Sequence, residues 1–143
     1  VGGKVVKSKP AEIGIMDISF SKDKNKDILF SSFPKNIKSL QWHSYEVNGL
    51  DNNKDITILA SSPITKYQIF KYKSHAYGIQ FHIEVKDTTV NEWGCVPEYK
   101  QALEDQLGEG ALDKFDQAAK DNMKDMNNYS KILYSKFKEI INA

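Results

Sequence analysis

The chain has 143 residues, of which 40% are hydrophobic and 27% are charged, and its formal net charge at pH 7 is +1. This composition is typical of one soluble globular domain and excludes a disordered or fibrous protein. No apolar run approaches the length that crosses a bilayer, and residues 1–9 lack the pattern of a secretory signal, so no membrane partner is expected. The single cysteine, Cys95, excludes an intramolecular disulfide and agrees with a cytoplasmic location.

The 20 basic residues are all lysines, because the chain contains no arginine. Lysine lacks the planar fork that binds guanine edges and phosphates at two points, and acidic residues are interspersed with the lysines throughout. The sequence therefore predicts a solvated, lysine-rich surface and disfavours nucleic acid as a partner.

The first part of the chain, residues 1–85, is predicted to be rich in short strands separated by polar, glycine or proline breaks. Residues 21–27 are expected to form an exposed charged turn, and residues 27–34, closed by Pro34, a loop or a single helical turn. The last predicted strand is the most continuously apolar, which favours burial on both of its faces. The predicted strands cover residues 4–7, 12–20, 39–47, 55–62, 67–73 and 76–85.

The second part, residues 86–143, changes to a helical period. One helix is predicted over 96–108, with Pro97 near its start and Gly108 at its end. After Gly110, apolar residues recur every three or four positions, which is typical of helices that bury one stripe in a core. The stripe consists of Leu112, Phe115, Ala119, Met123, Met126, Tyr129, Ile132, Leu133, Phe137, Ile140 and Ile141.

His82 and Glu84 are the residues with the clearest chemical potential. On a continuous strand they would project from the same face, with Cα atoms about 7 Å apart. The carboxylate could then accept a hydrogen bond from one ring nitrogen and stabilise the imidazolium that forms when the other nitrogen takes a proton. This is the base and its orienting acid, without a nucleophile. On spacing alone, an ordinary surface or core pair remains the alternative.

The sequence around this pair resembles class I glutamine amidotransferases, the family with a Cys-His-Glu triad. Its "YGIQFHIEV" is similar to the family's "G-x-Q-F-H-P-E", and other segments match in the family's order. These segments are "GGKV" at residues 2–5, "EIGI" at 12–15, "DILFSSFP" at 27–34, "QWHSYEV" at 41–47 and "ILASS" at 58–62.

The resemblance implies a doubly wound, flavodoxin-like α/β domain with added antiparallel strands and C-terminal helices, of which residues 1–143 form the C-terminal part. It implies that His82 is the general base, that Glu84 orients it, and that the backbone at Ser44 and Tyr45 holds glutamine. The implied reaction is attack of a cysteine thiolate on the glutamine side-chain amide, with release of ammonia and hydrolysis of a thioester.

Two departures from the family pattern limit this prediction. Ile83 stands where the family has proline, and the family's "G-x-C-x-G" nucleophile segment would lie upstream of Val1. Cys95 is not a replacement, because no apolar strand leads into it and Val-Pro follows it. The chain alone is therefore predicted to be inactive.

The other histidines do not suggest a site. His43 is expected to be packed or to line a pocket wall, and His75 to be solvated. No histidine or cysteine pair has metal-ligand spacing and no glycine-rich phosphate loop occurs, so neither a metal nor a cofactor is predicted.

Three hypotheses remain open from the sequence. The first is the C-terminal portion of a glutamine amidotransferase, whose partners would be glutamine, a chain that supplies the missing N-terminal half, and a synthase subunit that accepts ammonia. The second is a γ-glutamyl amide or peptide hydrolase of the same fold. The third is a noncatalytic binding or regulatory module in which the His82–Glu84 pair is vestigial.

Overall fold

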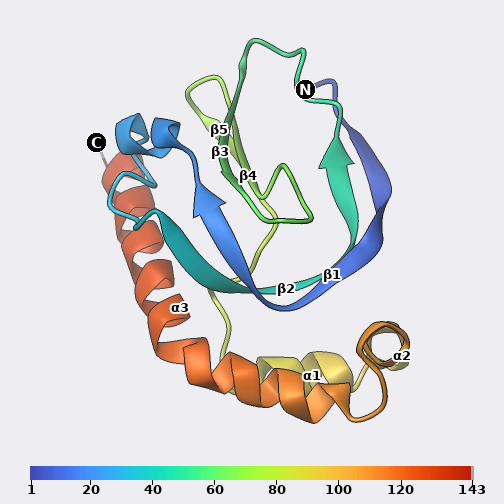
Figure 1. The fold of residues 1–143 in the computed structure, drawn as a ribbon. Helices are drawn as coiled ribbons and strands as arrows, with labels where there is room; N and C mark the ends of the chain where they lie inside the picture. Colours follow the sequence, from blue (N-terminus) through green and yellow to red (C-terminus); the bar gives the residue numbers. More distant parts are fainter. Residues whose placement is uncertain (143) are drawn as a thin grey trace.

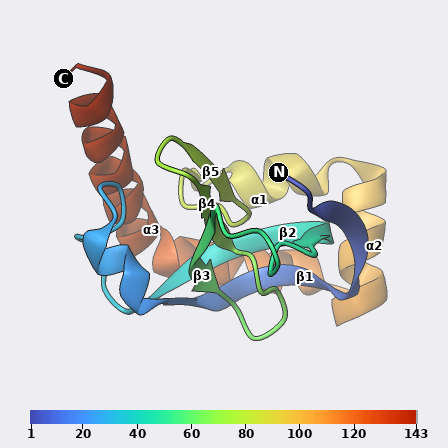
Figure 2. The same ribbon diagram turned by 90° about the horizontal axis from the view of Figure 1, so that it is seen from above.

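The computed structural model describes residues 1–142, which form a curled antiparallel sheet with helices along its outside (Figures 1 and 2). The elements in chain order are β1 (Lys4–Phe20), the 3-10 helix η1 (Lys22–Lys26), β2 (Asn36–Asn48), β3 (Ile56–Ser61), β4 (Ile69–Tyr72), β5 (Ala76–Ile79), α1 (Thr89–Gly94), α2 (Pro97–Leu107) and α3 (Ala111–Ile141).

The sheet has five strands in the order β2-β1-β3-β4-β5, and all neighbouring pairs are antiparallel. The two predicted strands at the N-terminus are one 17-residue strand, β1, whose pairing with β2 changes register between Lys7 and Glu12. Pro10 lies in this interval and has no N–H for a ladder hydrogen bond, which explains the irregularity. The sheet remains continuous because Ile13 and Ile18 anchor the rest of β1 in the core.

Aromatic and aliphatic side chains from the sheet, the segment 27–34 and the helices form one core. Phe20, Phe30 and Phe33 pack with ring centroids 5.3–5.8 Å apart. Phe33 also stacks against Tyr129 of α3, at 5.6 Å. The segment 27–34 makes this possible because it forms a hydrogen-bonded turn, in which the Ser31 N–H donates to the Asp27 carbonyl at 3.0 Å, in keeping with the predicted loop or single helical turn.

The helical part largely agrees with its prediction. Pro97 begins α2, and Gly108 follows its end with a φ of 87°, a conformation that glycine adopts without strain. The apolar stripe lies on the single 31-residue helix α3, and its first half is buried. Towards the C-terminus the stripe becomes exposed, and Phe137 retains 50% of its accessible surface. The sequence did not predict α1.

Two local predictions were wrong. The strand expected over 76–85 ends at Ile79, and β5 is an edge strand on which Ile79 is 41% exposed, so it is not buried on both faces. The chain leaves the sheet here because β4 begins at Ile69, the partner of Ile79, and offers no further strand to pair with. The charged turn over 21–27 contains η1, in which Lys24 is buried.

The expected fold class is confirmed at the level of a mixed α/β domain with antiparallel strands and C-terminal helices. Among residues 1–142, no helix combines the length and the apolarity that a membrane crossing requires.

Candidate active site

The backbone of His82 is fixed by the buried strand β2. His82 and Leu40 form an isolated antiparallel bridge, in which the His82 N–H donates to the Leu40 carbonyl at 2.8 Å and the Leu40 N–H donates back at 3.1 Å. Leu40 is fully buried, and the flanking Phe81 and Ile83 side chains also enter the core. His82 is therefore held at the rim of the core although the regular strand has already ended.

The structure brings the His82 and Glu84 side chains together. The Nδ1 atom of His82 lies 2.7 Å from Oε1 of Glu84, a short hydrogen bond between ring and carboxylate. The two side chains retain 34% and 61% of their accessible surface, so the pair lies at the protein surface. Among the described residues, no hydrogen bond occupies the second ring nitrogen, Nε2, which leaves it able to exchange a proton.

The hydrogen bond from His82 lowers the pKa of the Glu84 carboxyl below its usual value of 4.5, against the opposing effect of partial burial, and nearby backbone N–H groups add to the lowering. Glu84 is therefore charged at neutral pH. Solvent screens so exposed a pair, and its contribution to stability is accordingly small.

Ile83, the departure from the family's proline, strengthens this arrangement. Its backbone N–H donates to Oε2 of Glu84 at 3.0 Å, so each carboxylate oxygen has its own donor. A proline has no N–H and could not make this bond. The Ile83 side chain is meanwhile buried in the core.

An aromatic hollow adjoins His82. The Trp93 ring of α1 packs edge-on against the imidazole, with centroids 5.0 Å apart. Trp42 of β2 and Tyr99 of α2 complete a hollow of about 320 Å³ lined by these three residues and His82. The surface beside the ring is therefore apolar and aromatic.

Ser44 and Tyr45 lie on β2, and the Tyr45 carbonyl connects that strand to the segment that leads to His82. This oxygen accepts a hydrogen bond from Nε2 of Gln80 at 2.9 Å and lies 3.0 Å from Nδ1 of His43. The Tyr45 side chain is 57% exposed. His43 itself is packed, with 12% of its side chain accessible. This agrees with the first of the two expectations for it, a packed residue or one in a pocket wall.

Cys95 lies at the C-terminal end of α1 and is exposed. Its position after a helix, instead of in a sharp turn between a strand and a helix, is unlike that of an activated thiol. Within residues 1–142, no cluster of three or more histidine, cysteine, aspartate or glutamate side chains has the arrangement of a metal site.

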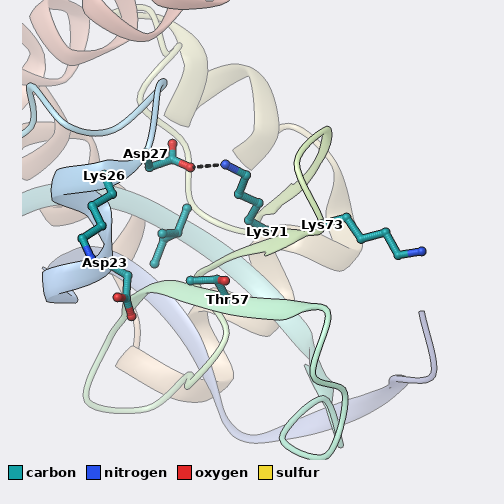
Figure 3. A pocket seen from close by; sticks show the side chains of 7 residues that line it. Asp23, Lys26, Asp27, Thr57, Lys71 and Lys73 are labelled. Atoms are coloured by element: carbon teal, nitrogen blue, oxygen red, sulfur yellow. Dashed lines mark hydrogen bonds and ion pairs between the residues drawn. The ribbon is translucent and has the colours of Figure 1, made fainter.

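A second cavity, of about 220 Å³, opens away from His82 beside η1 and β4 (Figure 3). Its most notable residue, the buried Asp27, has a structural function. Asp27 Oδ1 accepts hydrogen bonds from the backbone N–H groups of Leu29 and Phe30, while Oδ2 accepts from Lys71 and from the Tyr77 hydroxyl, both at 2.9 Å. These four bonds give each carboxylate oxygen two donors, so Asp27 has no hydrogen-bonding capacity left for a ligand.

Replacing Asp27 with asparagine is expected to lower the free energy of unfolding by about 3 kcal/mol, because it breaks a largely buried ion pair. Denaturant titration measures this loss.

The same contacts make the stability depend on pH. The hydrogen bond to Asp27 raises the pKa of Lys71 above its usual 10.5, and burial is the main cause that raises the pKa of Tyr77. A pKa that is raised in the folded state stabilises the protein at pH values below the pKa of the unfolded state. This stabilisation is lost as the pH rises through the pKa of the folded state. The wild type should therefore lose stability above about pH 10.5, and Asp27→Asn should lose less there.

Asp23→Asn is the matched control, because Asp23 is exposed and lines the same cavity. It is expected to unfold within 0.5 kcal/mol of the wild type. Equal effects of the two substitutions would contradict the assignment of Asp27 as the buried anchor.

The structure is thus a mixed α/β domain with a surface imidazole hydrogen-bonded to a carboxylate. The family model for class I glutamine amidotransferases matches residues 1–92. The chain belongs to this family.

Individual relatives agree with this assignment. The chain is 34% identical over 91 residues to a GMP synthase (glutamine-hydrolysing) of Wigglesworthia glossinidia brevipalpis, a match that spans 59% of this chain and 17% of the relative. A glutamine amidotransferase structure from Thermotoga maritima superposes with a TM-score of 0.75 at 27% identity, covering 94% of this chain and 54% of that one. A glutamine amidotransferase from Methylobacillus flagellatus, 18% identical, shares the fold with a TM-score of 0.71 over 96% of this chain and 56% of that one.

The chain thus spans about half the length of these solved structures and a smaller share of the curated relative.

Proposed function

We propose that residues 1–143 are the C-terminal part of a glutamine amidotransferase domain and supply the base and its orienting acid for hydrolysis of the glutamine side-chain amide. The observation that carries this proposal is the 2.7 Å hydrogen bond between His82 Nδ1 and Glu84 Oε1, which leaves Nε2 available for proton transfer. Membership of the family supports the reaction class.

In this mechanism a cysteine thiol upstream of Val1 transfers its proton to His82 Nε2 and attacks the amide carbon of glutamine. Glu84 stabilises the imidazolium, and the backbone at Ser44 and Tyr45 holds the substrate. The tetrahedral intermediate collapses when the C–N bond breaks and the leaving nitrogen takes the proton from His82, which releases ammonia. Water, deprotonated by His82, then cleaves the thioester to glutamate, and a synthase subunit would accept the ammonia.

This mechanism predicts that the 143-residue chain alone releases no ammonia from glutamine above the buffer blank. Addition of the thiol-bearing segment, as a separate polypeptide or in one chain, should restore release, and Cys95→Ala should leave the restored rate unchanged. Ammonia can be followed by an assay coupled through glutamate dehydrogenase, which consumes it. Turnover by the isolated chain that disappears in Cys95→Ala would overturn the proposal.

The aromatic hollow beside His82 favours a second candidate, hydrolysis of γ-glutamyl amides. Ammonia needs no such space, whereas the hollow of about 320 Å³ could receive a planar substituent on the leaving amine. Comparing kcat/KM for glutamine and for a γ-glutamyl arylamide in the restored protein separates the two. A preference for the arylamide that Tyr99→Ala removes would favour this candidate, because Tyr99 lies at the exposed side of the hollow.

A further inference from the structure

A buried carboxylate lies on β1, apart from the His82–Glu84 pair. Glu12 has no exposed surface, and it stands directly opposite His43 in the pairing of β1 with β2. Its Oε2 atom accepts a hydrogen bond from Gln68 Nε2 at 2.8 Å and lies 3.4 Å from His43 Nε2. A buried charge is costly unless it is paired and hydrogen-bonded, so the contacts of Oε2 with His43 and Gln68 offset part of this cost, while Oε1 has no hydrogen-bond partner among the described residues.

The charged form of Glu12 is favoured despite its burial. Burial raises the pKa of the carboxyl, but His43, Ser62 and Thr65 lower it by a larger amount in sum, so the pKa lies below its usual 4.5. Neither hydroxyl makes a hydrogen bond of normal geometry to Glu12 among the described residues, so its close polar partners are Gln68 Nε2 at 2.8 Å and His43 Nε2 at 3.4 Å.

The hydrogen bonds of His43 determine where its ring protons lie. Nδ1 faces the Tyr45 carbonyl at 3.0 Å, and since a carbonyl only accepts, Nδ1 must carry a proton. Nε2 faces the side-chain oxygen of Gln41 at 3.1 Å and the Glu12 carboxylate at 3.4 Å. The Gln41 amide could turn over, but a carboxylate can only accept, so Glu12 favours a proton on Nε2 as well.

The Tyr45 carbonyl is the point where this chain of contacts meets the candidate site. It accepts from His43 on one side and from Gln80, two residues before His82, on the other. Its position fixes the peptide groups of Ser44 and Tyr45 relative to the segment that carries His82. A misplacement of about 1 Å in a group that positions the substrate can cost about a hundredfold in activity.

We propose that Glu12 is a positioning residue: through His43 it holds the Tyr45 carbonyl and so places the glutamine-holding backbone of Ser44 and Tyr45. This inference rests on the proposed function for the role of that backbone. The contacts from Glu12 to Tyr45 stand independently of it.

The first test uses the 143-residue chain and needs no activity. Long-range 1H–15N NMR spectra of the histidine rings at neutral pH are expected to show a proton on Nδ1 of His43, the nitrogen that faces the Tyr45 carbonyl. In Glu12→Gln, the ring-nitrogen signals of His43 and the side-chain amide signals of Gln80, which donates to the same carbonyl, should shift. A proton on Nε2 alone in the wild type, or unchanged signals in the variant, would overturn the inference. The wild-type spectrum decides even if the variant does not fold.

The second test uses the restored amidotransferase at a temperature where all proteins are folded. Glu12→Gln is expected to raise the KM for glutamine about tenfold while kcat changes less than twofold, because His82 and Glu84 are untouched. Glu46→Gln, an isosteric change one residue after Tyr45, is the control and should leave both constants unchanged. An unchanged KM in Glu12→Gln overturns the inference, whereas absence of glutamine hydrolysis in the wild type overturns the proposed function and leaves the NMR test to decide this one.

Discussion

His82→Ala in the restored amidotransferase is expected to lower kcat for glutamine hydrolysis by about a thousandfold or more, with a smaller change in KM. The imidazole is the group that takes the thiol proton and returns it to the leaving nitrogen, and alanine can do neither. The expected loss is in the chemical step, because the bridge between His82 and Leu40 uses only backbone atoms and persists in the variant. Steady-state ammonia release measures the effect.

The matched control is His75→Ala. His75 is exposed and lies between β4 and β5, so its removal should leave kcat within twofold of the wild type. If His82→Ala retained full activity, the hydrolytic mechanism would fail and the noncatalytic hypothesis, in which the His82–Glu84 pair is vestigial, would replace it.

Phe30→Ala is expected to have the largest effect on stability, a loss of about 3–5 kcal/mol in the free energy of unfolding. Phe30 is fully buried and packs against Phe20, Phe33 and Tyr77, with centroids 5.3–6.1 Å away. The substitution leaves a cavity at the junction of β1, the segment 27–34 and β5. For a domain of ordinary stability this is about a fifth or more of the total.

Ile28→Ala provides the control for Phe30, because Ile28 is two residues away on the same segment and is 53% exposed. Its free energy of unfolding should change by less than about 1 kcal/mol. Denaturant titrations of both variants measure the difference. Equal midpoints would show that the segment 27–34 is not anchored by its aromatic ring.

The sequence predicted the parts of the fold that local patterns determine. Pro97 and Gly108 mark the ends of α2, and the periodic stripe after Gly110 predicts α3, because caps and periodicity depend on neighbours in sequence. The apolar run 76–85 was misleading because Phe81 and Ile83 reach the core from outside a regular strand, and burial alone does not distinguish the two cases. The short helix α1 was missed, since its six residues are too few to show a helical apolar period.

The candidate site, like the fold, could be predicted from the sequence only in part. Glu84 is two residues from His82, so their meeting could be predicted from spacing, although the prediction assumed a continuous strand. Glu12 and His43 are 31 positions apart and meet because the antiparallel pairing of β1 with β2 places them opposite each other. A periodic pattern of apolar residues does not indicate which residues of two strands pair. The one signal of the Glu12 contact in the sequence was a carboxylate at the start of the otherwise apolar run "EIGI".

The bridge between His82 and Leu40 also means that the two members of the pair are held in different ways. The His82 amide is bonded to a strand that has no exposed surface at Leu40, so it can exchange with solvent only when that part of the sheet opens. Glu84 has a mostly exposed side chain, which hydrogen bonds to the imidazole and to the Ile83 N–H hold in place. The backbone that carries the imidazole is thus anchored in the core, whereas the carboxylate is held at the surface by these two side-chain contacts.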